Sequence, residues 1–279
     1  MVPDIVIHGI VSAMYVGLAW YFWRTRWKRT AGFAPALEGR TGLRSWERVA
    51  ILVPLGLHGW LLYQGIFSRE LRFGFAQALS VMMFLGVALY WVESLFYNVE
   101  GMQPLVLALA APAAPLPALF PGLASSGAHA QAAEFKLHLA LAMMAYGLFV
   151  IALLHATLMA VVERRLHQRN ASFVGNLPPL LTLETLLFRM IAAAFAFLTL
   201  TLITGIAFSE TLFGRALRFD HKTVFAVASW LIFAWLLAGR WRYGWRGRTA
   251  LRWTLSGFVM LLLAYVGSRF VLEVLLGRS

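Results

Sequence analysis

Eight long apolar stretches, separated by polar or basic turns, constrain this chain more than any other feature of its sequence. A helical run of about 20 residues matches the roughly 30 Å hydrocarbon core of a bilayer. The predicted helices are about Ile5–Trp23, Val49–Phe67, Phe75–Trp91, Pro104–Pro121, Lys136–Val162, Leu186–Ile206, His221–Ala238 and Trp253–Leu272. We therefore expect an all-α, polytopic integral membrane bundle with about eight transmembrane helices, surrounded by lipid.

Composition supports this fold class. Hydrophobic residues make up 61% of the chain and charged residues only 13%, whereas about 25% is typical of soluble domains. The net charge of +12 comes from basic residues clustered between apolar runs, which is a membrane-orientation pattern and does not indicate a nucleic-acid partner. The absence of cysteine excludes disulfides and thiolate metal ligands within the chain.

The fourth apolar run is the least regular one. Pro104–Pro121 contains five prolines, and proline removes a backbone donor and breaks helices. We expect a kinked or broken span there, or a short helix followed by an irregular segment that is buried against its neighbours. The sequence alone leaves open whether this run crosses the whole bilayer.

Basic residues predict the orientation. The loops 24–48, 93–103, 163–189 and 239–252 hold 16 of the 24 Lys and Arg residues, and the opposite face holds the other 8. The positive-inside rule then places these loops in the cytoplasm and both termini on the periplasmic side of a bacterial inner membrane. We expect no cleavable signal peptide, because the first basic cluster follows the first apolar run.

Histidines are the most informative polar residues, because ionisable groups are costly inside a membrane. His138 and His221 are predicted near the outer rim, and His58 in the middle of the second span. Neutral imidazoles at such positions can ligate haem iron or another transition metal. The alternative for each is a structural hydrogen bond. Asp220 either orients His221 or caps the seventh helix.

Two further polar residues are interpreted as structural. His155 lies in the inner half of the fifth span beside an alanine face and is interpreted as a packing histidine. Glu93 falls at the predicted cytoplasmic boundary, where a carboxylate reaches water or a nearby arginine.

Three segments carry a family resemblance. They are His138 to Tyr146-Gly147, Pro178-Pro179 to Glu184, and the block Asp220-x-Lys222 … Gly244-Trp-Arg-Gly-Arg248. Together they resemble the CcsA/HemX-like cytochrome c assembly family, especially its YpjD-type members. The expected organisation is one membrane domain, 1–279, with a CcsA-like half at 136–272 and a divergent half at 1–121.

The resemblance implies a haem-handling protein that binds haem b. His138 corresponds to an external axial ligand of the family, and His58 is similar to a second-helix histidine of YpjD-type members. In place of the family's tryptophan-rich segment stands Glu210–Phe219, which has no Trp. A stand-alone haem-lyase enzyme is therefore not expected. His221 as a replacement second ligand is our own hypothesis.

The expected function is haem handling in cytochrome c biogenesis or haem homeostasis. Its expected partners are haem, another cytochrome c assembly protein or a haem-biosynthesis enzyme. Two alternatives remain open at this stage. One is an accessory protein for divalent-metal transport or efflux, and the other is a membrane scaffold that regulates a haem-biosynthesis enzyme.

Overall fold

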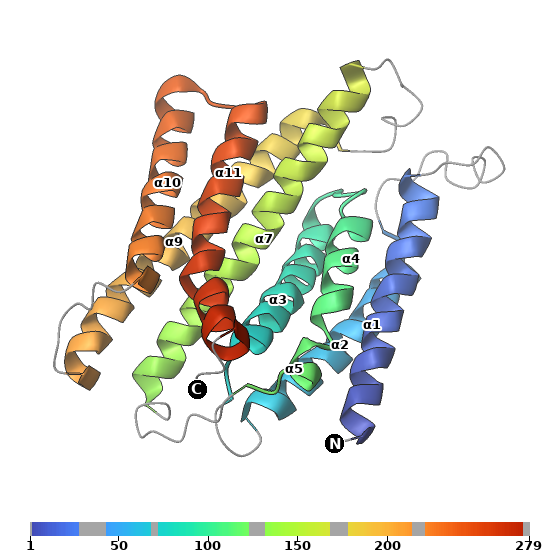
Figure 1. Cartoon of the computed structure of the whole chain (residues 1–279). Coiled ribbons are helices and arrows are strands. Elements are labelled where there is room, and N and C mark those ends of the chain that lie inside the picture. Colours follow the sequence, from blue (N-terminus) through green and yellow to red (C-terminus); the bar gives the residue numbers. More distant parts are fainter. Residues whose placement is uncertain are drawn as a thin grey trace.

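A computed structural model describes residues 2–27, 43–67, 72–122, 132–167, 178–213 and 221–275, and these residues fold into a helical bundle (Figure 1). Its helices are α1 (Val2–Phe22) continued by η1 (Trp23–Trp27), α2 (Ser45–Phe67), α3 (Phe75–Phe96), α4 (Gln103–Ala113), α5 (Leu116–Leu119), α7 (Ala133–His167), α9 (Leu180–Phe213), α10 (His221–Tyr243) and α11 (Gly247–Leu262), the last continued by η2 (Leu263–Gly267), α12 (Ser268–Phe270) and η3 (Val271–Leu275).

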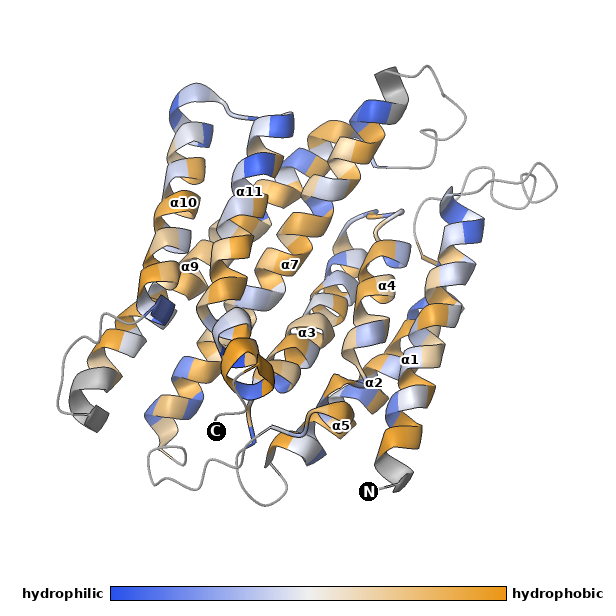
Figure 2. Ribbon diagram, viewed as in Figure 1, coloured by the Kyte–Doolittle hydropathy of each residue, from blue (hydrophilic) through white to orange (hydrophobic). Residues whose placement is uncertain are grey.

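Seven of these helical segments are long and apolar enough to cross a membrane, which confirms the all-α polytopic fold class. Successive helices run in opposite directions, and both ends of the chain lie at the same end of the bundle (Figure 1). Figure 2 shows hydrophobic residues along the middle of the helices and hydrophilic residues towards both ends of the bundle, including the end opposite the termini on α1, α7, α10 and α11. The side of the membrane on which the termini lie stays a prediction.

The proline-rich run has the expected break. Helix α4 ends at Ala113, and the four-residue helix α5 follows after Pro115. Pro115 has no N–H for the carbonyl of Ala111, four residues earlier. Ser12 of α1 donates its hydroxyl to that carbonyl over 2.8 Å and so replaces the donor that Pro115 lacks. His8 Nδ1 lies 2.7 Å from the carbonyl of Ala114, which Ala118 leaves free because its N–H bonds to Pro115 instead, so His8 is a structural histidine.

Two helix boundaries differ from the sequence prediction. Helix α9 continues to Phe213, although the predicted span ends at Ile206. Helix α3 continues to Phe96, although a turn was expected from Glu93. Neither helix has to end at the edge of the hydrocarbon, because intrahelical hydrogen bonds satisfy the backbone in lipid and at the interface alike.

Close packing of α3 on α7 joins the two halves of the chain. A Cβ atom at Gly147 of α7 would lie 2.7 Å from Leu85 Cβ, and one at Gly86 of α3 would lie 3.2 Å from a methyl of Val150. Glycines on both helices therefore let the two backbones approach, as small residues do at membrane helix interfaces.

This seam gives a stability prediction. Gly147→Ala should lower the free energy of unfolding by about 1–3 kcal/mol, because the new methyl overpacks the α3–α7 interface. The matched variant Gly17→Ala, at a helical glycine with nothing within 4 Å of the added Cβ, should stay within about 1 kcal/mol of the parent. Equilibrium unfolding in detergent, followed by circular dichroism, measures both. Equal stability of the two variants would contradict the packing argument.

The orientation is testable because the chain has no cysteine of its own. Ala133 and Arg248 are exposed residues at opposite ends of the bundle. With the predicted orientation, a membrane-impermeant thiol reagent should label Ala133→Cys in intact spheroplasts and Arg248→Cys only after lysis. The reverse pattern would show that the termini are cytoplasmic.

Candidate functional site

His138 lies in the second turn of α7, half-buried against α9. Its Nδ1 atom is 3.0 Å from Thr204 Oγ1. That hydroxyl also lies 2.8 Å from the carbonyl oxygen of Leu200, four residues earlier on α9. A hydroxyl has one proton and a carbonyl only accepts, so Thr204 donates to Leu200 and accepts from the imidazole. The hydrogen-bond pattern therefore assigns the proton to Nδ1 and leaves the lone pair on Nε2.

The neighbouring residue on α9 fixes the position of the same ring. A Cβ atom at Gly205 would lie 3.1 Å from His138 Cε1, so any larger residue there would push against the imidazole. Thr204 and Gly205 together set the orientation of His138. This arrangement, a neutral imidazole whose second nitrogen donates to the protein, is typical of metal-ligating histidines.

His58 has a different environment, fully buried among α1, α2 and α3. Its Nε2 lies 2.8 Å from Ser80 Oγ, and its Nδ1 lies 3.3 Å from the hydroxyl of Tyr15. Phe84 packs edge-on against the ring. Both nitrogens already have protein partners, so His58 has to release one hydroxyl before it can bind a metal.

The remaining predicted site residues are less fully placed. His221 is exposed at the first residue of α10, a helix that packs on α9 and α11. Asp220 lies outside the described residues. Helix α9 contacts both α7 and α10, so it is the element through which His138 and His221 are connected. Their pairing stays a prediction. Within the described ranges, no group of three or more His, Asp or Glu side chains is arranged to hold a metal ion.

Sequence reasoning missed a buried ionic cluster at the end of the bundle opposite the termini. Arg26 was assigned to a basic loop, but η1 buries it, and its guanidinium lies 3.0 Å from Glu47 Oε2. Tyr21 donates its hydroxyl to the same carboxylate over 3.0 Å, and the backbone N–H of Arg44 donates over 2.8 Å. The signal in the sequence was Glu47, the one carboxylate close to the start of the second span. The cluster ties α1 to α2 and explains why the first helix continues to Trp27.

Glu93 and His155 are a second correction. Glu93 was expected at the water boundary and His155 in an apolar packing face. The structure buries both and brings Glu93 Oε1 to 3.1 Å from His155 Nε2 across the α3–α7 seam. No sequence spacing predicts this contact, because it depends on the register of two helices that are distant in the chain.

Segments that carried the family resemblance meet in space. Glu184 of α9 forms ion pairs with Arg240 and Arg246, which lie on either side of the turn between α10 and α11. Gly244 adopts the left-handed conformation, φ 66°, that this turn requires. Trp245 folds back over Gly239. These contacts hold α9, α10 and α11 together at one end of the bundle, so the role of these residues here is structural.

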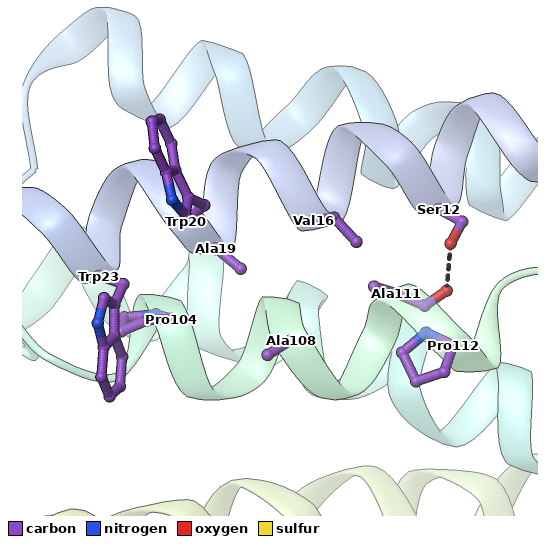
Figure 3. Close-up of a pocket in the computed structure, with 9 residues that line it drawn as sticks. All are labelled: Ser12, Val16, Ala19, Trp20, Trp23, Pro104, Ala108, Ala111 and Pro112. Carbon is purple, nitrogen blue, oxygen red and sulfur yellow. Dashed lines mark hydrogen bonds between the residues drawn. The ribbon is translucent and has the colours of Figure 1, made fainter.

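A shallow groove between α1 and α4 is another concave feature (Figure 3). Its volume is about 480 Å³, and it is lined by Ser12, Val16, Ala19, Trp20, Trp23, Pro104, Ala108, Ala111 and Pro112. The lining is apolar and includes no titratable side chain, and the hydroxyl of Ser12 is already bonded to Ala111. The groove therefore suits a hydrocarbon chain and offers no ligand to a metal.

Comparison with known proteins identifies the family. Residues 46–276 match the family described as cytochrome C assembly protein, which is well over half of the chain. The chain belongs to the cytochrome c assembly protein family. The match begins inside α2, so it includes both His58 and His138.

Several curated relatives are similar to part of the chain. The inner membrane protein YpjD of Escherichia coli (strain K12) is 33% identical over 138 residues, which are 50% of this chain and 52% of the relative. An uncharacterized 28.8 kDa protein of Azospirillum brasilense is 37% identical over 142 residues, with the same coverage. The cytochrome c biogenesis protein CcsA of Prochlorococcus marinus (strain MIT 9515) is 31% identical over 155 residues, 48% of this chain and 50% of the relative. The chain thus spans about half the length of these relatives, and no solved structure matches it.

The tautomer of His138 is directly testable. ¹⁵N NMR of histidine-labelled protein in lipid should show Nδ1 protonated and Nε2 unprotonated for this residue. Thr204→Val, which removes the acceptor, should give a mixture of tautomers, and Thr204→Ser should keep the parent pattern. Thr185→Val is the matched control, because Thr185 also donates to the carbonyl four residues earlier but lies exposed. A protonated Nε2 in the parent protein would contradict the assignment.

Proposed function

We propose that this protein is a multi-pass inner-membrane protein that binds haem b and acts in cytochrome c biogenesis or haem homeostasis. The observation that carries the proposal is the ring of His138. It is half-buried in the second turn of α7 and held through Nδ1 by Thr204, which in the neutral ring leaves the lone pair on Nε2. Membership of the cytochrome c assembly family supports the same function.

The donor set of the described residues fits haem. Iron in haem accepts a neutral imidazole nitrogen as an axial ligand, which is what His138 Nε2 offers. Thr204 keeps the donor lone pair on that atom, and the absence of a side chain at Gly205 keeps the ring in place. A bound haem would supply the redox-active iron. The contribution of this chain is to bind and orient it at the outer rim.

His58 is the second candidate ligand in this proposal. It is enclosed by Tyr15, Ser80 and Phe84, so binding there requires the release of at least one hydroxyl contact. His221, with Asp220 beside it in sequence, is the candidate for a second ligand at the rim. The two histidines predict different sites, one within the bundle and one at its surface, and separate variants distinguish them.

The segment Glu210–Phe219 shapes the proposal further, because it has no tryptophan. Tryptophan offers the largest flat ring as a platform for a planar ligand, and this stretch has only the smaller rings of Phe213 and Phe219. We therefore propose that the protein holds or delivers haem and works with another assembly protein or a haem-biosynthesis enzyme, without attaching haem to a cytochrome by itself.

Absorbance of the purified protein tests the proposal. Protein produced with haem supply should show a Soret band. His138→Ala should lower haem affinity at least about tenfold. Loss of a residue that only orients a metal ligand already costs about that much, and loss of the ligand itself should cost no less. His138→Gly should regain the band when imidazole is added. His221→Ala should change the spectrum only if His221 is the second ligand, and His58→Ala only if the buried site is occupied. A parent protein with no Soret band would refute the proposal.

A further inference from the structure

Glu93 and His155 form a buried pair of ionisable groups in the described part of the bundle. Both are buried at the α3–α7 seam, His155 completely and Glu93 with 5% exposure. The distance from Glu93 Oε1 to His155 Nε2 is 3.1 Å. Neither residue belongs to the proposed haem site, because His138 lies almost five helical turns earlier on α7.

The second nitrogen of the imidazole fixes the proton count of the pair. His155 Nδ1 lies 2.9 Å from the carbonyl oxygen of Ile151. A carbonyl only accepts, so Nδ1 carries a proton. In a neutral ring Nε2 then has a lone pair, and it faces a carboxylate oxygen that also has only lone pairs. Two facing lone pairs at this distance repel each other, so we infer one more proton on the pair, either on the imidazole or on the carboxyl group.

His155 is the ion-pair partner of Glu93 among the described residues. Arg48 of α2 reaches the next residue of α3, where it donates to the carbonyl of Ser94.

Several buried polar atoms at this place have no hydrogen bond of good geometry. They are both carboxylate oxygens of Glu93, His155 Nε2 and the hydroxyl of Tyr90, one turn earlier on α3. Gln103, Arg26 and Glu100 lie around the Tyr90 hydroxyl, and Arg26 is already bound to Glu47. Buried polar atoms without partners need an explanation, and a bound proton is one.

We propose that Glu93 and His155 form a proton-binding site that holds a single proton between the two side chains. Removing the proton leaves a buried carboxylate facing an imidazole lone pair, and adding a second leaves a buried positive charge. Both states are costly in a low-dielectric interior, so the singly protonated, net-neutral pair is favoured. This inference is independent of haem binding.

The variant Glu93→Gln tests whether the bound proton can be removed while the fold is kept. Its amide N–H can donate to Nε2 of a neutral His155 in place of the shared proton. The variant should therefore fold with α3 and α7 packed as in the parent, but without the titratable proton. Full-length protein in lipid nanodiscs is compared with this variant by infrared spectroscopy and by ¹⁵N NMR of histidine.

Spectroscopy should count one proton on the pair. At neutral pH the parent should show one of two signatures. Either a protonated-carboxyl band disappears in Glu93→Gln, or His155 is doubly protonated and loses that signal in the variant. A neutral His155 beside an ionised Glu93, or protonation of both groups, would overturn the proposal.

Discussion

The lack of water inside a bilayer is the constraint on which this structure depends. A polar group that leaves water has to find its partner within the protein, or its burial costs several kcal/mol. The break after α4 shows the constraint at the level of the backbone. Pro115 removes one donor, and Ser12, on a helix distant in sequence, replaces it. The same requirement explains why Arg26, Glu47, Glu93 and His155 occur only as pairs or clusters.

Hydrophobic run length and proline content predicted most of the fold. The positions of the long helices, the break in the proline-rich run and the common end of the two termini all follow from local properties of the sequence. Helix ends were predicted less well, because an intrahelical backbone is equally satisfied in lipid and at its edge. Arg26 was misassigned for a related reason, since a charge beside an apolar run looks like a loop residue until its partner Glu47 is placed next to it.

The candidate site was predictable only in part. His138 came from a motif with a family resemblance, but its partners Thr204 and Gly205 depend on the register of α9 against α7. Likewise, the depth of His58 was expected from its place in the run, whereas its enclosure by Tyr15 and Ser80 was not. A single sequence shows which residues share one helix face. It does not show which residue of another helix faces them, and this is why the pairing of Glu93 with His155 emerged only from the structure.

The unequal lengths of the helices have a consequence for the surrounding lipid. Helices α7 and α9 have 35 and 34 residues and are therefore about 50 Å long, whereas the segment from Gln103 to Leu119 measures about 25 Å. The α4–α5 segment is thus shorter than a hydrocarbon layer of roughly 30 Å, whereas its neighbours α1 and α2 are long enough to cross it and α7 and α9 are longer. Lipid that contacts α4 and α5 directly would thin by a few ångströms, while the long helices tilt or project into the headgroups. The protein would then present an uneven hydrophobic thickness to the lipid. Membrane thickness would influence its lateral position and which neighbouring proteins share the deformed lipid.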